Sequence, residues 1–293
     1  MNTPIMRPRH RTDREPPTSK TPDVPEFPAE QCDALFAAVL AHDDIYPDAG
    51  LPDVIPLDYS QQQIIRCYRI CRQIWKAVDR SALDGLIKTI YRQRALGPED
   101  QLLFKHVRAK FKHLRFAYAT FDERHRYPRA FHWLTAAMGY LQDALKNEQH
   151  AATGRLAIRT RLFLTRPFYA LATREIDGFR PGTATTFGNY VRNEIGFIRM
   201  NLAREKITSR DFHEIRKAVS RQVALYDNLK ILYPSPCHCS ISRYLSTING
   251  MMGAMHDELI AGKLKKTRDY YADTFEIPGE IKQRLIAFTE RYR

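Results

Sequence analysis

The sequence predicts an all-α protein: two pseudo-symmetric helical-bundle repeats behind a disordered N-terminal tail. Three observations support this prediction. Apolar residues recur at helical spacing almost throughout the chain from Tyr59 onward, strand-type alternation is absent, and two pairs of segments match each other at similar offsets. Because 44% of the 293 residues are hydrophobic, the chain can build a core, which excludes a fully disordered protein.

The first 58 residues differ in composition from the rest. Residues 1–30 hold seven of the 17 prolines and little periodicity, so we expect a disordered tail. Residues 31–58 contain six aspartates and no Lys or Arg, and predict a short helix over 32–42 followed by an acidic linker. Residues 59–293 are expected to form the helical domain, with repeat one at about 80–176 and repeat two at about 184–293.

The helices of this domain can be assigned in order. Ser60 and Gln63 have the spacing of a capping box, ahead of an apolar periodic set that runs to Val78. Gly97-Pro98, Tyr127-Pro128, Gly178–Gly182 and Pro234–Pro236 mark breaks between the later helices. Those helices are predicted over about 82–94, 99–122, 128–148, 154–176, 186–204, 210–232, 239–262 and 279–292.

Two segment pairs indicate an internal repeat. FKHVRAKFKHLRFAYATF (104–121) matches FHEIRKAVSRQVALYDNL (212–229) at an offset of 108, which pairs Arg108 with Arg216. FHWLTAAMGYLQDAL (131–145) matches LSTINGMMGAMHDEL (245–259) at an offset of 114, which repeats a Gly-x-x-x-Asp pattern. Two tandem copies of one helical unit explain both matches.

The first segment of each copy carries a basic face. In the 99–122 helix an apolar stripe from Val107 to Phe121 lies about 120° from a ladder of cations. The net charge is +13, and residues 59–293 alone carry +19, so we expect this face to meet a polyanion. The candidate binding residues are Lys105, Arg108, Lys112 and Arg115 in copy one and His213, Arg216, Lys217 and Arg221 in copy two.

Asp143 and Asp257 each follow a helical glycine by four residues. We interpret them as supporting acidic residues that orient an arginine of the basic helix. Three other basic groups are weaker candidates for the same surface, because such groups are more often solvated faces. They are Arg155, Arg159, Arg161 and Arg166; Arg192 and Arg199; and Lys263, Lys265, Lys266 and Arg268.

These motifs resemble the CHAD family, the conserved histidine α-helical domain. Its repeats begin with a His-x-x-Arg-x-x-x-(Arg/Lys)-x-x-Arg helix and continue into a helix ending Leu-Gly-x-x-(Arg/Asn)-Asp. Copy two has His213-Glu-Ile-Arg216 and later Gly253 to Asp257, whereas copy one has Lys105 at the His position. Copy two also lacks cations at positions 220 and 223. The resemblance covers about residues 80–290.

The resemblance implies two helical halves with a basic groove between them that binds inorganic polyphosphate without catalysis. It implies no cofactor, and association with polyphosphate granules. Lys, Arg and protonated His can each bond phosphate oxygens. Three features of the sequence bear on localisation. The first residues contain no apolar signal region, and no apolar run reaches the roughly 20 residues that a membrane span requires. The five cysteines do not suit a disulfide framework. We therefore expect a cytoplasmic protein without a membrane partner.

Alternative functions remain open at this point. Nucleic-acid binding is the second interpretation, because aromatic residues are interleaved with the basic ones (Phe104, Phe116, Tyr118, His125 and Tyr127). An enzyme is the third, through His213 with His256-Asp257. A zinc site from Cys237-His238-Cys239 with Cys67 and Cys71 matches no common ligand spacing. A protein scaffold, with the acidic 31–58 segment covering the basic groove, is a further hypothesis.

Overall fold

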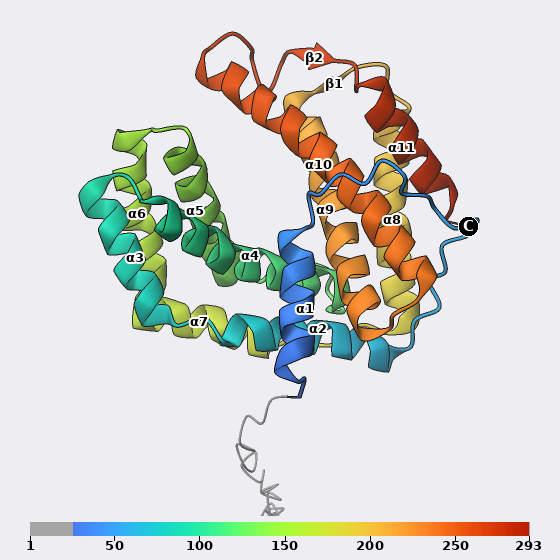
Figure 1. Ribbon diagram of the computed structural model, residues 1–293, viewed down its shortest axis with the longest axis horizontal. Helices are drawn as coiled ribbons and strands as arrows, with labels where there is room; N and C mark the ends of the chain where they lie inside the picture. Colours follow the sequence, from blue (N-terminus) through green and yellow to red (C-terminus); the bar gives the residue numbers. More distant parts are fainter. Residues whose placement is uncertain (1–25, 293) are drawn as a thin grey trace, which may run out of the picture.

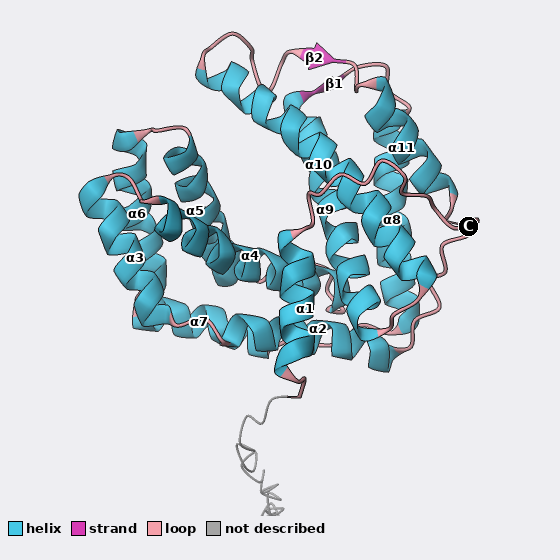
Figure 2. Ribbon diagram, in the orientation of Figure 1, coloured by secondary structure: helices cyan, strands magenta, loops and turns pink. Residues whose placement is uncertain are grey.

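The computed structural model describes residues 26–292, and this part of the chain is helical almost throughout (Figures 1 and 2). The all-α prediction is confirmed. The elements are α1 Ala29–Leu40, α2 Gln61–Lys76, α3 Arg80–Gln93, α4 Pro98–Phe121, α5 Arg129–Lys146, α6 His150–Leu164, α7 Arg166–Asp177, α8 Ala184–Leu202, β1 Ile207–Thr208, α9 Ser209–Leu232, α10 Pro236–Leu264, β2 Thr274–Phe275 and α11 Gly279–Glu290.

The expectation of no strands is wrong in one detail. β1 and β2 pair antiparallel, with Ile207 opposite Phe275, and tie the loop before α11 to the start of α9. Two residues per strand are too few to give the alternation by which a strand is recognised in a sequence.

Repeat one is a ring of four helices. α3 packs on α4, α4 on α5, α5 on α6, and α6 closes the ring against α3, while α7 lies outside it against α5 and α6. Its core contains Trp75 of α2, Phe111 of α4 and Phe131 of α5, whose rings lie within 6.0 Å of one another, centroid to centroid. The apolar stripe predicted on α4 therefore faces the core, since Phe111, Leu114, Tyr118 and Phe121 are all buried.

Repeat two has the same order of contacts. α8 packs on α9, α9 on α10, α10 on α11, and α11 closes the ring against α8. The matched segments thus occupy equivalent places, α4 with α9 and α5 with α10, as a tandem duplication of one helical unit requires. The two bundles stand side by side in Figure 1, joined where α4 contacts α8 and α9.

The single helix predicted over 154–176 is wrong, because it is two helices. A continuous helix would place Pro167 in its interior, where proline has no N–H to donate and its ring collides with the preceding turn. The chain instead becomes extended at Thr165 (ψ 149°), and Pro167 falls in the first turn of α7. Arg80 Nη1 donates to the Leu164 carbonyl at 2.7 Å, which satisfies one of the carbonyl groups at the end of α6.

The predicted tail, residues 1–30, lies mostly outside the described residues, and its predicted end is too late. Phe27 is buried, and Gln73 of α2 bonds both its backbone N and its backbone O. α1 begins at Ala29 and contacts α2, α4 and α9, so it lies across the junction of the two repeats.

The capping box at Ser60 and Gln63 is confirmed. The helix that it begins, α2, also contacts both α4 and α9.

Residues 41–50, which we call the strap, are docked on α10. Ser246 Oγ donates to the carbonyls of Ala41 and Asp44, each at 2.9 Å, and the backbone N of Tyr46 donates to Thr247 Oγ1 at 2.9 Å. Gly250 permits the close approach, because a Cβ at that position would lie 2.2 Å from the Asp43 carbonyl oxygen. This part of the predicted acidic linker is therefore held on repeat two.

We expect Gly250→Ala to lower the free energy of unfolding by about 1–2 kcal/mol. The added methyl group displaces the strap and breaks several hydrogen bonds worth about 0.5–1.5 kcal/mol each, which outweighs a gain of about 1 kcal/mol in helix propensity. Gly85→Ala is the control: nothing lies within 4 Å of its Cβ position, so it gains up to about 1 kcal/mol from the same propensity term. Urea unfolding of the two variants measures both changes in the free energy of unfolding. Equal effects of the two substitutions would contradict the role given to Gly250.

Candidate functional site

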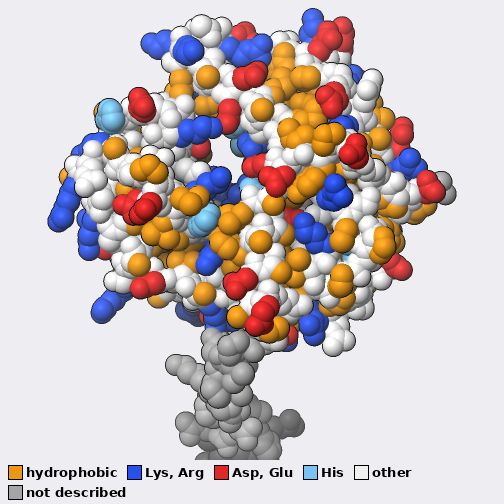
Figure 3. Space-filling model, viewed as in Figure 1, with side chains coloured by type: hydrophobic (Ala, Val, Ile, Leu, Met, Phe, Trp, Pro, Cys, Tyr) orange, Lys and Arg blue, Asp and Glu red, His pale blue; other side chains and the backbone are white. Residues whose placement is uncertain are grey.

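The basic faces of the two repeats meet at one surface, which we call the basic groove. It is lined by Arg108, Lys112 and Arg115 of α4 and by His213, Arg216, Lys217 and Arg221 of α9. Arg216 interacts electrostatically with Arg108 and Lys112, and Arg115 with Arg108 and Arg221, so these side chains of both repeats are neighbours. Figure 3 shows the molecule hollowed between the bundles, with basic, histidine and some acidic side chains at the rim. Lys105, one turn before Arg108, is exposed.

One arginine of each repeat lies over a glycine of the following helix. A Cβ on Gly139 of α5 would lie 3.0 Å from Arg108 Nη2, and a Cβ on Gly253 of α10 would lie 3.1 Å from Arg216 Nη2. The two arrangements are equivalent under the sequence alignment of the repeats. The repeated glycines therefore give space to the two guanidinium groups, which bring positive charge from both bundles to the groove.

Four of the groove cations form no ion pair with a carboxylate of the described residues, although Asp143 and Asp43 interact with some of them from a greater distance. Among residues 26–292 no carboxylate forms an ion pair with Arg108, Lys112, Arg115 or Arg216, and all four are partly buried. The Nε atoms of the three arginines are buried without a hydrogen-bond partner. Their neutral contacts are long: Arg108 Nη1 to Gln142 Oε1 and Arg115 Nη1 to His132 Nδ1 are each 3.4 Å. A buried cation without a close ion-pair partner is costly, and a bound anion would offset that cost.

The other two predicted cations of α9 are already paired. Lys217 Nζ lies 2.7 Å from Glu214 of the same helix. Arg221 lies 2.5 Å from Glu194 of α8, and it also donates to the Tyr127 hydroxyl at 3.0 Å. The positive charge available to a ligand is therefore concentrated on α4 and Arg216.

One of the two aspartates, Asp257, has a different partner from the one we expected. Asp257 forms an ion pair of 2.6 Å with Lys146 of repeat one, so it joins the two repeats and does not hold Arg216. Asp143 interacts electrostatically with Arg108, Asp257 and Arg216. The prediction that each aspartate orients the arginine of its own repeat is wrong for Asp257, because a lysine at the end of α5 reaches it across the groove.

Five groups in the groove have strongly lowered pKa values, and burial is the main cause for each; the pKa values of His42 and His132 are each lowered to about 4. Burial, followed by the charge of Arg108, lowers the pKa of Lys112 to about 7. Burial, followed by Lys217, lowers the pKa of His213 to about 4, and burial, followed by Arg216, lowers that of His256 to about 3. Both imidazoles are therefore neutral at pH 7, with ring centroids 4.7 Å apart.

The metal-dependent alternatives find no site in the described part of the chain. No group of three or more His, Cys, Asp or Glu side chains there is arranged to hold a metal ion, which includes the surroundings of His213 and His256. Cys67 and Cys71 are buried on α2, where Cys71 Sγ donates to the Cys67 carbonyl and to Asn228 Oδ1.

The strap reaches the rim of the groove. Asp43 interacts electrostatically with Lys112, and His42 Nε2 lies 3.4 Å from Lys112 Nζ. Under the repeat alignment, Ser246 and Gly250 of α10 correspond to His132 and Ala136 of α5. The strap therefore covers, on repeat two, positions whose counterparts on repeat one lie on the groove face.

Several of the weaker basic candidates have local partners. Arg161 lies 3.2 Å from Asp84 Oδ1, Arg199 donates to the carbonyls of Thr289 and Tyr292 at the end of α11, and Lys263 and Arg268 lie over aromatic rings. Three residues that lie at the groove were not identified from the sequence: His42, His132 and Lys146. A signal for two of them exists, because His132, Gly139, Asp143 and Lys146 follow one another at spacings of 7, 4 and 3 and so share one face of α5.

Comparisons of the chain with protein-family models, curated protein sequences and solved structures found no match. No helix in residues 26–292 is both long enough and apolar enough to cross a membrane.

Lys112→Met tests the cost of the unpaired cations. Between about pH 7 and the ordinary lysine value of 10.5, the unfolded chain holds a proton at Lys112 that the folded protein has lost, so the penalty of burying this lysine falls as the pH rises. We expect the substitution to raise the free energy of unfolding by about 1 kcal/mol or more at pH 7, and the gain to shrink toward pH 10.

The control for this substitution is Lys105→Met, which removes an exposed lysine from the same helix. It should change the unfolding free energy by less than about 0.5 kcal/mol. Urea unfolding of both variants from pH 6.5 to pH 10 measures the difference. Matching pH profiles would refute the assignment of a burial cost to Lys112.

Proposed function

We propose that this protein binds inorganic polyphosphate in the basic groove, without catalysis and without a cofactor, in the manner of the CHAD family that its motifs resemble. The observation that carries the proposal is the convergence of Arg108, Lys112, Arg115 and Arg216 from two repeats, none of them in an ion pair with a carboxylate of the described residues. A phosphate chain carries about one charge per phosphate, and its oxygens accept charge-assisted hydrogen bonds from such cations. The proposed setting is the cytoplasm, at polyphosphate granules.

The burial of the aromatic residues favours a bare phosphate chain over nucleic acid. Phe104, Phe116 and Tyr118 are at most 3% exposed, so they offer no surface to a base. His125 is stacked on Tyr190, and Tyr127 on His132, at 4.4 and 5.2 Å between ring centroids. Binding to single-stranded nucleic acid normally combines phosphate contacts with base stacking. The groove offers phosphate contacts, whereas these five aromatic residues are buried or already stacked and are not available to a base. Nucleic acid therefore remains the alternative only through contacts with its phosphate backbone.

A competition experiment tests the choice of polyanion. Labelled long-chain polyphosphate is displaced by unlabelled polyphosphate, single-stranded RNA or duplex DNA, matched in phosphate concentration, at about 150 mM salt, where the Debye length of about 8 Å screens non-specific attraction. We expect polyphosphate to compete far better than either nucleic acid. Equal or better competition by RNA or DNA would favour the alternative function.

Arg108→Ala and Arg216→Ala test the site. Each removes charge-assisted hydrogen bonds of about 1.5–3 kcal/mol, so we expect the dissociation constant for polyphosphate to rise about tenfold or more per substitution. Arg155→Ala removes an exposed arginine of α6 and is the matched control, with little change expected. Circular dichroism verifies the helical content of all three. Unchanged affinity in the Arg108→Ala/Arg216→Ala double variant would refute the site.

Asp43→Asn tests whether the strap opposes binding. Asp43 is exposed and accepts a hydrogen bond from Asn249 Nδ2, which an asparagine oxygen can also accept, so the strap stays docked while one negative charge at the rim is lost. We expect affinity for polyphosphate to rise about two- to fivefold, equivalent to roughly 0.5–1 kcal/mol. Asp48→Asn, an equal charge change farther along the strap, should have a smaller effect. A tie between the two variants would argue against a specific role for Asp43.

A further inference from the structure

We propose a second anion-binding site, separate from the basic groove, for a compact ligand that carries several phosphate groups. The site is a cleft of about 610 Å³ between the α4–α5 loop and the end of α7, and we call it the arginine cleft. Arg124, Arg126, Arg129, Arg174 and Arg180 line it. The proposal does not depend on what the basic groove binds.

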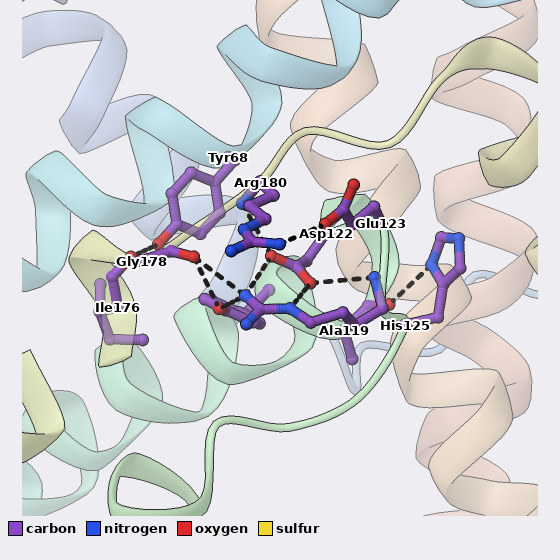
Figure 4. Close-up of polar contacts among 10 residues, drawn as sticks. Tyr68, Ala119, Asp122, Glu123, His125, Ile176, Gly178 and Arg180 are labelled. Carbon is purple, nitrogen blue, oxygen red and sulfur yellow. Dashed lines mark hydrogen bonds and ion pairs between the residues drawn. The ribbon is translucent and has the colours of Figure 1, made fainter. Parts of the chain in front are cut away.

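One wall of the arginine cleft is fixed by a buried carboxylate. Asp122 is fully buried; its Oδ1 accepts from Arg124 Nε at 2.6 Å and its Oδ2 from the backbone N of Arg180 at 2.8 Å (Figure 4). Arg124 Nη2 also donates to the Gly178 carbonyl at 2.9 Å. The loops after α4 and α7 are therefore joined through one carboxylate and one guanidinium, which holds the cleft open in the free protein.

The opposite wall is fixed by Glu175 of α7. Its Oε2 accepts from the backbone N of Ala130 at 2.7 Å and of Phe131 at 3.2 Å, so the carboxylate occupies the N-terminus of α5. These bonds satisfy two backbone groups that lack partners within the helix. Glu175 forms no ion pair with the arginines of the described residues around it.

Three guanidinium groups in the cleft are free to bind a ligand. Arg124 is paired with Asp122, and Arg180 with Glu123 at 3.3 Å. The guanidinium groups of Arg126, Arg129 and Arg174 are exposed and form no hydrogen bond or ion pair with any of residues 26–292. They come from a loop and from two different helices, and they face a single concave space.

This arrangement selects the chemical class of the ligand. A guanidinium group presents a planar fork of donors that matches phosphate oxygens in pairs, and three of them around one cleft match several negative charges. The cleft volume falls within the range of roughly 300–1,000 Å³ that is usual for small-molecule sites. A nucleoside triphosphate, a short inorganic phosphate chain and an inositol polyphosphate share this chemistry.

The arginine cleft and the basic groove share one residue as a wall. Tyr127 lines the cleft, while its hydroxyl accepts from Arg221 and its ring lies 5.0 Å from the Arg115 guanidinium. A probe that binds either surface could therefore be assigned to the wrong one. The experiment is designed to separate them.

Isothermal titration calorimetry in about 150 mM salt uses three probes in separate arms: ATP, tripolyphosphate and inositol hexakisphosphate. The protein is the full chain carrying Arg108→Ala and Arg216→Ala, so that the groove is disabled. Adding Arg126→Ala and Arg174→Ala should weaken binding of the preferred probe at least tenfold, and adding Arg155→Ala instead should leave it unchanged. The ranking of the three probes identifies which kind of ligand the cleft prefers.

Two results would overturn the proposal. The first is that none of the three probes binds more tightly than inorganic phosphate. The second is that Arg126→Ala and Arg174→Ala leave the binding of every probe unchanged in the groove-disabled protein. Neither result bears on polyphosphate binding by the groove, which is measured separately with Arg108→Ala and Arg216→Ala in the otherwise unaltered chain.

Discussion

The stacking of Arg108 and Arg216 on glycines of the neighbouring helices determines how this protein carries its charge. Without side chains at Gly139 and Gly253, two guanidinium groups can lie close against α5 and α10 and converge from separate bundles. Their convergence, together with Lys112 and Arg115, collects like charges that form no ion pair with a carboxylate of the described residues. Such an arrangement is unfavourable in isolation, so the aromatic cores and the helices that cross the junction, α1 and α2, must hold the bundles together against it.

The two walls of the groove differ although the repeats are related. On repeat one, α5 presents His132 and Gly139, with Arg108 lying against the glycine. On repeat two, the corresponding part of α10 is covered by the strap, which adds the carboxylate of Asp43. A duplicated unit would give a symmetric groove, and the N-terminal segment removes that symmetry. A phosphate chain bound as proposed would therefore meet most of its cations on α4 and Arg216.

The features that depend on local periodicity could be predicted from the sequence. Apolar and basic stripes on α4 lie on different faces of one helix, so the core and the groove face could both be predicted from spacing alone. The ion pairs of Arg221 with Glu194 and of Asp257 with Lys146 could not, because they join residues whose proximity depends on how the helices pack. The arginine cleft was missed for the same reason: its arginines have no helical spacing and meet only when α7 packs on α5.

The lowered pKa values give the groove a charge that depends on its occupant. With His213 and His256 neutral at pH 7 and Lys112 near its midpoint, the empty groove carries less positive charge than its residue types suggest. This limits the repulsion that the unpaired arginines would otherwise feel. A polyanion bound beside these groups would favour their protonated forms and raise their pKa values again. Binding and proton uptake are then linked, and affinity increases as the pH falls, because the complex holds more protons than the free protein. The partly deprotonated lysine and the neutral histidines thus limit repulsion in the free protein, and in the proposed complex they would supply additional charge.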